Sequence, residues 1–280
     1  MTKDSDHLIK AEEYGIPQKR HRVILLGVRE DIEIAPATLK TSKKNNLRSV
    51  IDGLPRVRSG IYREFSHSVD VQSDTGIKKR RIYNNLKDSF EVWSEKIREY
   101  AVQLQEPFFV RGYNVELDTK LPQTIGKEYF ETPSSLSERH PLYEWYNDEN
   151  LVAAIHHESR RHLTQDLKRY LFASLYTSFF KKFPRMDDYK AFGDDLLPDH
   201  ENAESGKFND RFRVQLPNDP ARTVTSHISK DGHYFIHYDP SQCRSLTVKE
   251  AARIQTFPDN YFFCSSRKAN SKQVSIMKNA

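Results

Sequence analysis

The sequence predicts an α/β fold built from amphipathic helices and short strands. Apolar residues recur at three- and four-residue spacing in two segments, 86–104 and 163–180, as they do in helices. A continuous run of branched apolar residues, 23–28, is typical of a strand that is covered on both faces. Two strand-like pieces within 220–238 flank a Ser-Lys-Asp-Gly turn, which predicts a hairpin.

The composition is that of a polar chain that still contains enough apolar residues for a core. Of 280 residues, 37% are apolar and 30% charged, with 16 Phe, 14 Tyr and a net charge of +5. The basic excess is compatible with a nucleic-acid partner. Two cysteines indicate a reducing compartment. No membrane-length apolar run and no signal-peptide core is found, so we expect a cytoplasmic protein.

The other segments follow from local composition. Residues 41–46 are rich in lysine and predict an exposed loop, and 47–60 predict a short helix followed by a turn. Residues 107–150 have no clear period, and 184–210 are rich in loop-forming residues. A last helix begins at Thr247, which forms a capping box with Glu250, and Pro258 ends it.

The stretch Gln-Lys-Arg-His-Arg, residues 18–22, places three cations beside the apolar run. If this stretch is extended, Arg20 and Arg22 point to one face and His21 to the other. Paired guanidiniums suit a phosphate or the carbonyl edge of a base, because each offers planar, paired donors. A solvated strand end explains the same charges.

Two stretches resemble the DNA (cytosine-5) methyltransferases. Residues 14–31, YGIPQKRHRVILLGVRED, are similar to the family's eighth motif, Q-x-R-x-R followed by a strand. Residues 220–263 are similar to its ninth motif, R-x-L-[ST]-x-R-E-x-A-R-x-Q-x-F-P-D, with Lys249 in place of a common Arg. The positions that fill the ninth pattern are Arg244, Leu246, Thr247, Glu250, Ala252, Arg253, Gln255, Phe257, Pro258 and Asp259.

The resemblance implies an architecture. It is the C-terminal fragment of a Rossmann-like methyltransferase sheet together with an α+β target-recognition region. Residues 1–46 would end the catalytic sheet and 47–219 would form the target-recognition region. Residues 220–263 would hold the hairpin and the motif-nine helix, and 264–280 an incomplete tenth motif.

The resemblance also implies roles for single residues. Arg22 matches the arginine that holds a flipped cytosine by its O2, and Arg20 matches its neighbour, which contacts the substrate and the DNA backbone. Gln18 matches a position that braces this turn, and we predict that it also contacts the DNA. Arg244, with Glu250 and Arg253 of the same motif, matches structural positions. An enzyme that acts on a base must take it out of the stack and hold its polar edge.

The sequence departs from the family in its catalytic parts. The nucleophile of the family is a Cys in a Pro-Cys motif, whereas Cys243 follows Gln and Cys264 follows Phe. The Glu-Asn-Val segment is absent, and no two of the ten glycines are spaced as in G-x-G. We therefore expect S-adenosylmethionine to be bound mainly by a separate or missing N-terminal half, and both cysteines to be ordinary buried residues.

The C-terminal end matches the tenth motif, Q-x-G-N-A-V-P, in one of two ways. Either Gln273 begins the motif and the remainder diverges, or residues 277–280 match I-G-N-A. We prefer the second, which makes Asn279 the one cofactor-side residue of this chain. Lys278 then stands where a glycine would allow a positive φ.

Three further basic groups are predicted to contact duplex DNA, although a solvated surface explains each equally well. They are Lys78, Lys79, Arg80 and Arg81, then Arg160 and Arg161, then Arg211 and Arg213.

We predict no metal site. The histidines of IHHESRRH, 155–162, are not spaced for one helix face: His157 and His162 are five apart. A D-x-K fragment, Asp188 to Lys190, with Asp187 or Asp199, leaves a metal-dependent nuclease as an alternative. A DNA-binding module without chemistry is the other.

The expected activity is methyl transfer to C5 of cytosine in a specific sequence, in restriction–modification. We expect the isolated chain to be inactive. The chain could be one half of a two-chain enzyme, a truncated gene product, or part of a longer chain. Its start just before motif eight favours the first two, and its end within the last motif favours truncation.

Overall fold

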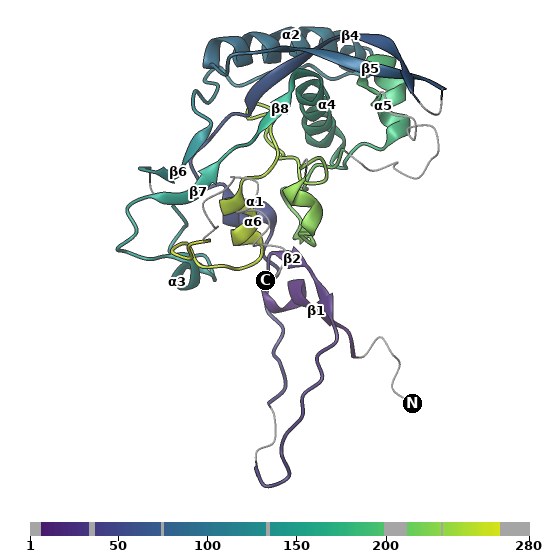
Figure 1. Ribbon diagram of the computed structural model, residues 1–280. Coiled ribbons are helices and arrows are strands. Elements are labelled where there is room, and N and C mark those ends of the chain that lie inside the picture. The colour runs from purple at the N-terminus through teal and green to yellow at the C-terminus, as the bar shows by residue number, and fades with distance from the viewer. Residues whose placement is uncertain are drawn as a thin grey trace.

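A computed structural model describes residues 7–33, 37–73, 76–132, 135–198, 212–230 and 232–263. Figure 1 shows two long helices, α2 and α4, at one end of the molecule, with the strands β4 and β5 beside them. The small elements α1, α6, β6 and β7 lie in the middle, and the chain after β3 runs out as a long loop at the opposite end. The predictions for Arg211, Asp199, Cys264 and the segment 264–280, including Asn279, concern residues outside the described ones.

Most elements are short. The N-terminal part contains β1 (Ile9–Lys10), the 3₁₀ helix η2 (Ala11–Tyr14), β2 (Gln18–Lys19), β3 (His21–Arg22) and α1 (Leu47–Ile51). The middle contains β4 (Gly60–Ser73), β5 (Gly76–Asn85), α2 (Phe90–Phe109), β6 (Gly126–Phe130), α3 (Tyr143–Tyr146), β7 (Ala154–Glu158) and β8 (Arg161–Leu163). The last part contains α4 (Thr164–Phe180), α5 (Met186–Phe192), η3 (Asp194–Leu196), β9 (Ala221–Arg222), η4 (Ser226–Ser229) and α6 (Val248–Ile254).

The two long helices confirm the periodicity prediction and build much of the core. Helix α2 begins at Phe90 because the Ser89 hydroxyl accepts a hydrogen bond from the Val92 backbone N–H at 3.3 Å. It packs against α4, where Phe108 meets Phe172 with ring centroids 5.9 Å apart. Both of these phenylalanines are fully buried, so the apolar stripes read from the sequence are the packing faces.

The described strands form four sheets of two or three strands each, in the orders β1-β3, β2-β9, β5-β4-β8 and β6-β7. The mixed α/β class is confirmed at this level. A Rossmann-like sheet is not among these sheets, so that part of the expectation stays a prediction, as do the domain boundaries. Helix α6 packs on α1 and β7, which joins residues from two of the predicted segments in one core.

The prediction of a buried strand at 23–28 is wrong. These residues have no regular structure and pair with no described strand, and their apolar side chains are exposed, Leu25 by 93% and Leu26 by 70%. A fully apolar strand requires neighbours on its edges and layers on its faces. The described residues supply neither for this run.

The predicted hairpin at 220–238 is also wrong. The first piece forms only β9, which pairs in parallel with β2, and the chain then turns into the 3₁₀ helix η4. The second piece contributes single bridges from Ile236 to Val214 and Ser245. Long-range partners therefore replace the local pairing that the Lys-Asp-Gly signal indicated.

One smaller expectation differs as well, and two others are confirmed. Residues 184–210 were expected to be loop, but α5 forms there, with Asp188 accepting from the backbone N–H of Arg185 at 2.7 Å. The predicted loop at 41–46 is confirmed, although Asn45 is buried within it. The last helix is confirmed with its capping box, since Thr247 and Glu250 each accept from the other's backbone N–H.

Candidate nucleic-acid interface

Gln18 fixes the position of the basic turn. Its side chain is 1% exposed, and its amide donates to the Ile254 carbonyl at 3.3 Å and accepts from the Val224 N–H at 3.1 Å. One side chain thus joins β2 to the end of α6 and to the segment after β9. Gln18 is therefore a bracing residue in this structure, and its burial leaves no surface for the DNA contact that we also predicted for it.

Arg20 and Arg22 lie close to each other beyond that brace. Arg20 is half-buried and Arg22 is exposed, and Arg22 donates to the His21 carbonyl at 2.7 Å. Partial burial and then the positive charge of Arg22 lower the pKa of Arg20, so the two guanidiniums repel each other. The His21 ring pairs with Glu12 at 2.9 Å. Two neighbouring cations, one of them open to solvent, form a site for an anion or a carbonyl edge.

A cationic cavity of about 510 Å³ adjoins this turn. Lys19 and Arg222 line it from β2 and β9, which are paired opposite each other. The Thr223 hydroxyl donates to the Lys19 carbonyl at 2.6 Å and fixes the two segments together. The remaining lining residues are Arg213, Gln215, Thr225, His227, Tyr234 and Phe235. An anion such as a phosphate fits this charge.

Sequence reasoning missed Lys19 and Arg222 in this role. They are 203 positions apart by their numbers and meet only because β2 and β9 pair in parallel. The predicted Arg213 also lines the cavity, but it is only 8% exposed and its guanidinium lies 4.3 Å from the Phe183 ring centre. Arg213 therefore forms part of the wall of the cavity.

The motif-nine arginines are buried in ion pairs. Arg244 binds both carboxylate oxygens of Glu250 at 2.6 Å, and each residue is 1% exposed. Arg244 also donates to the Val57 carbonyl at 3.0 Å. Burial raises the pKa of Glu250, but Arg244 outweighs burial and holds that pKa far below its usual range. This pair fixes the start of α6 against residues near α1.

Arg253 makes the second buried pair, at the other end of α6. It binds Asp259 at 2.8 Å and donates to the Val50 carbonyl of α1 at 2.8 Å. Lys249, which replaces the common Arg, donates to the Asp259 carbonyl at 2.6 Å. Helix α6 is thus held at both ends by charged groups, and it in turn holds Gln18 through Ile254.

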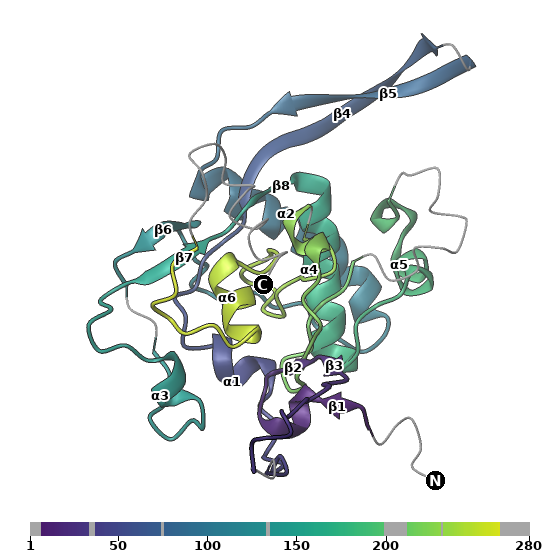
Figure 2. The same cartoon turned by 60° about the horizontal axis from the view of Figure 1, so that its bottom comes forward.

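The other predicted basic residues lie in different places. Arg160 donates to the Ile228 carbonyl at 2.7 Å and the Lys230 carbonyl at 3.3 Å, so it supports η4. The Arg161 side chain is 61% exposed and lies 3.7 Å from Asp88. The group 78–81 lies on β5, which projects from the body with β4 as a two-stranded ribbon (Figure 2). The structure therefore does not bring these groups together with Arg20 and Arg22 in a single cluster.

The nuclease alternative gains no support from the described residues. Asp188 accepts from the Tyr176 hydroxyl at 2.8 Å and caps α5. The described part of the chain contains no group of three or more His, Cys, Asp or Glu side chains that could hold a metal ion.

Cys243 is fully buried, its thiol donates to the Leu167 carbonyl at 3.1 Å, and burial raises its pKa. A protonated, buried thiol is no nucleophile.

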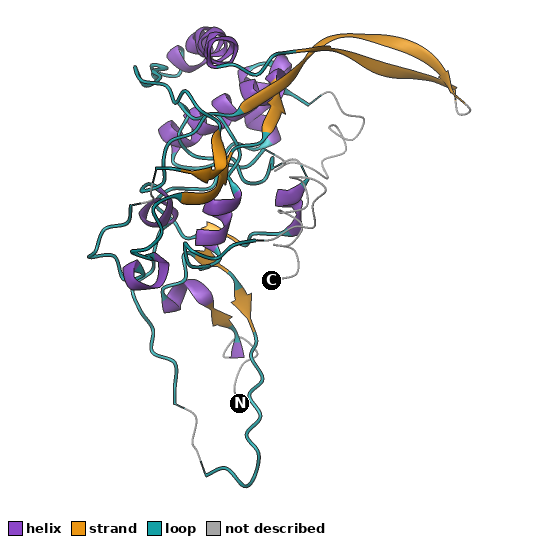
Figure 3. Cartoon of the chain, turned by 60° about the vertical axis from the view of Figure 1, so that its left-hand side comes forward, coloured by secondary structure: helices purple, strands orange, loops and turns teal. Residues whose placement is uncertain are grey.

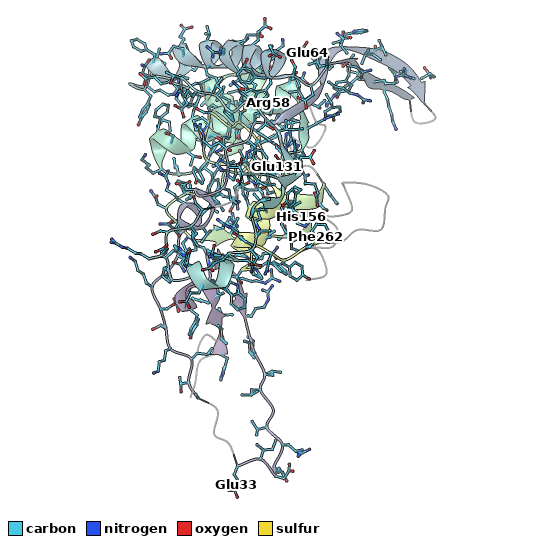
Figure 4. The ribbon with its side chains drawn as sticks, turned by 90° about the vertical axis from the view of Figure 1, so that its left-hand side faces the viewer. Glu33, Arg58, Glu64, Glu131, His156 and Phe262 are labelled. Atoms are coloured by element: carbon cyan, nitrogen blue, oxygen red, sulfur yellow. The ribbon has the colours of Figure 1, made fainter. Side chains whose placement is uncertain are left out.

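The core contains several buried histidines. The His157 ring accepts from the Thr247 hydroxyl at 3.0 Å and donates to the Pro55 carbonyl at 2.7 Å. In Figure 4, His156 lies beside Phe262 in the middle of the molecule, and their ring centroids are 4.7 Å apart. Burial lowers the pKa of His157 to about 4, and it lowers the pKa of His162 and His237 as well.

These histidines predict loss of stability in mild acid. Below the ordinary histidine pKa of about 6.5, the unfolded chain takes up protons that the folded chain does not, so the free energy of unfolding falls with pH. Each of His157, His162 and His237 contributes up to about 2 kcal/mol of this loss between pH 7 and pH 5. Urea unfolding across that range measures it, with His157→Gln as the variant expected to have a shallower dependence. A stability independent of pH over this window would contradict the assignment.

A family model supplies the decisive comparison. The model described as C-5 cytosine-specific DNA methylase matches residues 5–276. The chain belongs to this family. Among curated relatives, the type II methyltransferase M.Bpa9945I of Bacillus paralicheniformis is 56% identical over 78 residues, 28% of this chain and 17% of that protein. The putative type II methyltransferase M.OihORF3336P of Oceanobacillus iheyensis is 20% identical over 95% of this chain and 56% of that protein.

A third relative, the type II methyltransferase M.BbvI of Brevibacillus brevis, is 31% identical over 33% of this chain and 23% of that protein. The chain thus spans from under a fifth to a little over half the length of these relatives. No solved structure matches it. No helix of the described residues is long and apolar enough to cross a membrane.

Proposed function

We propose that this chain is the DNA-binding and target-base part of a cytosine-5 DNA methyltransferase of the restriction–modification type. The observation that carries the proposal is the adjacency of the Arg20–Arg22 pair to the cationic cavity that Lys19 and Arg222 line. The arginine pair holds the displaced cytosine, and the cavity binds the phosphates that flank it. A DNA substrate places the enzyme in the cytoplasm.

Arg22 acts on the base edge. Its exposed guanidinium donates hydrogen bonds to the O2 of the flipped cytosine, and Arg20 adds positive charge behind it. When a thiolate attacks C6, electron density moves into the ring and onto O2, where a fixed cation stabilises it. Gln18 acts indirectly, because its two hydrogen bonds hold the turn that carries both arginines.

The described residues do not fit S-adenosylmethionine, the methyl donor of the family. The cofactor carries a positive sulfonium, and the cavity beside Arg20 is itself cationic. A larger cavity of about 700 Å³ is lined by Asp52, Asp219 and Asp239. Asp52 already accepts from the Tyr238 hydroxyl and Asp239 already pairs with Arg56, while Asp219 lies 3.7 Å from the exposed Lys19 ammonium. We therefore assign the cofactor and the nucleophile to an N-terminal methyltransferase half, and no step through the cofactor is derived for this chain.

The exposed run 23–28 is the proposed docking strand for that half. Five branched apolar side chains, Val23, Ile24, Leu25, Leu26 and Val28, are 44–93% exposed. An apolar strand without neighbours is completed by addition to the edge of another sheet, which supplies backbone hydrogen bonds and covers both faces. In Figure 3 this run lies in the long loop that extends away from the body, where a second polypeptide can reach it.

The buried thiol of Cys243 favours one alternative, a DNA-binding module without chemistry. Both proposals include DNA binding, and methyl transfer in the presence of an N-terminal half separates them.

The DNA-binding proposal predicts a steep dependence on salt. We expect the affinity for mixed-sequence duplex DNA to fall by a factor of about 10³ or more between 50 and 200 mM salt, as for proteins with six or more phosphate contacts. Fluorescence anisotropy with a labelled duplex measures this directly. An affinity that does not change with salt, or no binding at 50 mM, would contradict the proposed function.

A further inference from the structure

The β4–β5 ribbon is a surface that the rest of the chain leaves uncovered. Strand β8 pairs with β4 only from Gly60 to Arg63, so beyond that point β4 has β5 on one edge and no described strand on the other. All residues from 76 to 81 are exposed, including Ile77 at 70%. Figure 3 shows the ribbon reaching well beyond the body. An isolated two-stranded ribbon is marginally stable in water, which favours a role in contact with a partner.

The base of the ribbon is held firmly. The Lys96 side chain of α2 binds Glu64 at 2.8 Å, and the rings of Phe65 and Tyr83 meet edge to face with centroids 6.1 Å apart. A register shift between Phe65 and His67 marks a bulge at the same level. Bulges bend a strand and change its direction. The contacts and the bulge at the base therefore set the direction in which the outer ribbon projects.

The register divides the four cations between the two faces. Lys78 lies opposite Val71 and Arg80 opposite Val69, so these two share one face. Lys79 lies opposite Asp70 and Arg81 opposite Ser68, on the other face. On each face the two cations are about 7 Å apart along the strand. Within the described residues, no ion pair engages Lys78, Lys79 or Arg80.

We propose that the outer ribbon, residues 67–73 and 76–82, enters the major groove of duplex DNA, with Lys78 and Arg80 facing one phosphate backbone and Lys79 and Arg81 the other. The proposal rests on the proposed function, because it takes DNA as the partner. A flat surface would meet only one face of the ribbon, whereas the two walls of a groove meet both. A sheet layer with its side chains is about 10 Å thick. It fits the major groove, about 12 Å wide, and not the minor groove, about 6 Å wide.

Two double variants test the two faces separately. Lys78→Ala/Arg80→Ala and Lys79→Ala/Arg81→Ala should each reduce the slope of log affinity against log salt by about 1.8, and the fourfold variant by about 3.6. Arg98→Ala/Lys190→Ala is the matched control, since it removes two exposed cations from α2 and α5 and should leave the slope unchanged. An effect from one face alone places the ribbon against the outside of the duplex and overturns the proposal.

The groove itself is tested with modified DNA. A duplex methylated at guanine N7, which lies in the major groove, should bind the full chain at least tenfold more weakly than unmodified duplex. Blocking the minor groove with a saturating ligand should leave the affinity unchanged. A shortened variant, in which Asn-Gly joins His67 directly to its partner Ile82, should be insensitive to N7 methylation while keeping its folded far-UV spectrum.

These outcomes separate this proposal from the proposed function. If the full chain binds DNA with a steep salt dependence and neither double variant changes the slope, the cations only protect an exposed sheet edge and the groove proposal is wrong. If the full chain does not bind duplex DNA at all, the proposed function is wrong and the groove proposal falls with it. Self-association that the fourfold variant abolishes, with DNA affinity unchanged, would assign the ribbon to a second copy and also overturns it.

Discussion

Replacing Arg22 with alanine is expected to lower the methyl-transfer rate of the enzyme, reconstituted with an N-terminal half, by about 10²- to 10³-fold. The loss follows from removing a fixed cation from the atom where charge develops during attack on the ring. The affinity for DNA should change little, because Arg22 is one cation among those of the cavity and the ribbon. Single-turnover rates at saturating DNA isolate the chemical step from binding.

Arg29→Ala is the matched control for this prediction. Arg29 is exposed on the same segment and is bound to Asp31, away from the basic turn. Its removal should leave the rate within about twofold of the parent. Arg22→Lys keeps the charge but loses the planar fork and should recover only part of the rate. A near-normal rate for Arg22→Ala would remove the base-edge role from motif eight.

Replacing Arg244 with alanine is expected to reduce the free energy of unfolding by about 3–5 kcal/mol. The substitution leaves the Glu250 carboxylate buried without its cation, which is one of the costliest single changes in a protein interior. The same change frees the Val57 carbonyl and one end of the α6 anchor. Urea unfolding at pH 7.5, where His157, His162 and His237 are neutral, measures the effect.

The double variant Arg244→Met/Glu250→Leu keeps this prediction testable if the single variant does not fold. It removes both charges together and should be more stable than Arg244→Ala, because no unpaired charge remains in the core. A loss below about 1 kcal/mol for Arg244→Ala, or a double variant less stable than the single one, would contradict the structural role of the pair.

Local signals in the sequence predicted the elements whose causes are local. The capping box of α6 joins Thr247 to Glu250, three residues away, and the stripes of α2 and α4 repeat within each helix. The hairpin at 220–238 failed because its backbone groups find distant partners. The Val224 N–H donates to Gln18, 206 residues earlier, and no local pattern encodes that bond.

The candidate site was predictable only in part for the same reason. The resemblance to the methyltransferases singled out Arg20 and Arg22, which are two positions apart in the sequence and lie close together in the structure. Lys19 and Arg222 come together through strand pairing between opposite ends of the chain. Arg160 was predicted to contact DNA, but it donates to two backbone carbonyls and so holds η4 in place. The charge of an arginine does not tell these two roles apart.

Methyl transfer from labelled S-adenosylmethionine to mixed-sequence duplex DNA tests the central claim most directly. It is measured for this chain alone, for a family N-terminal half that carries the Pro-Cys and G-x-G motifs alone, and for the two together. We predict 5-methylcytosine only from the mixture, and loss of that product when Leu25 and Leu26 of the exposed run are both changed to Asp. Incorporation by this chain alone would contradict the assignment of nucleophile and cofactor to an N-terminal half outside these 280 residues.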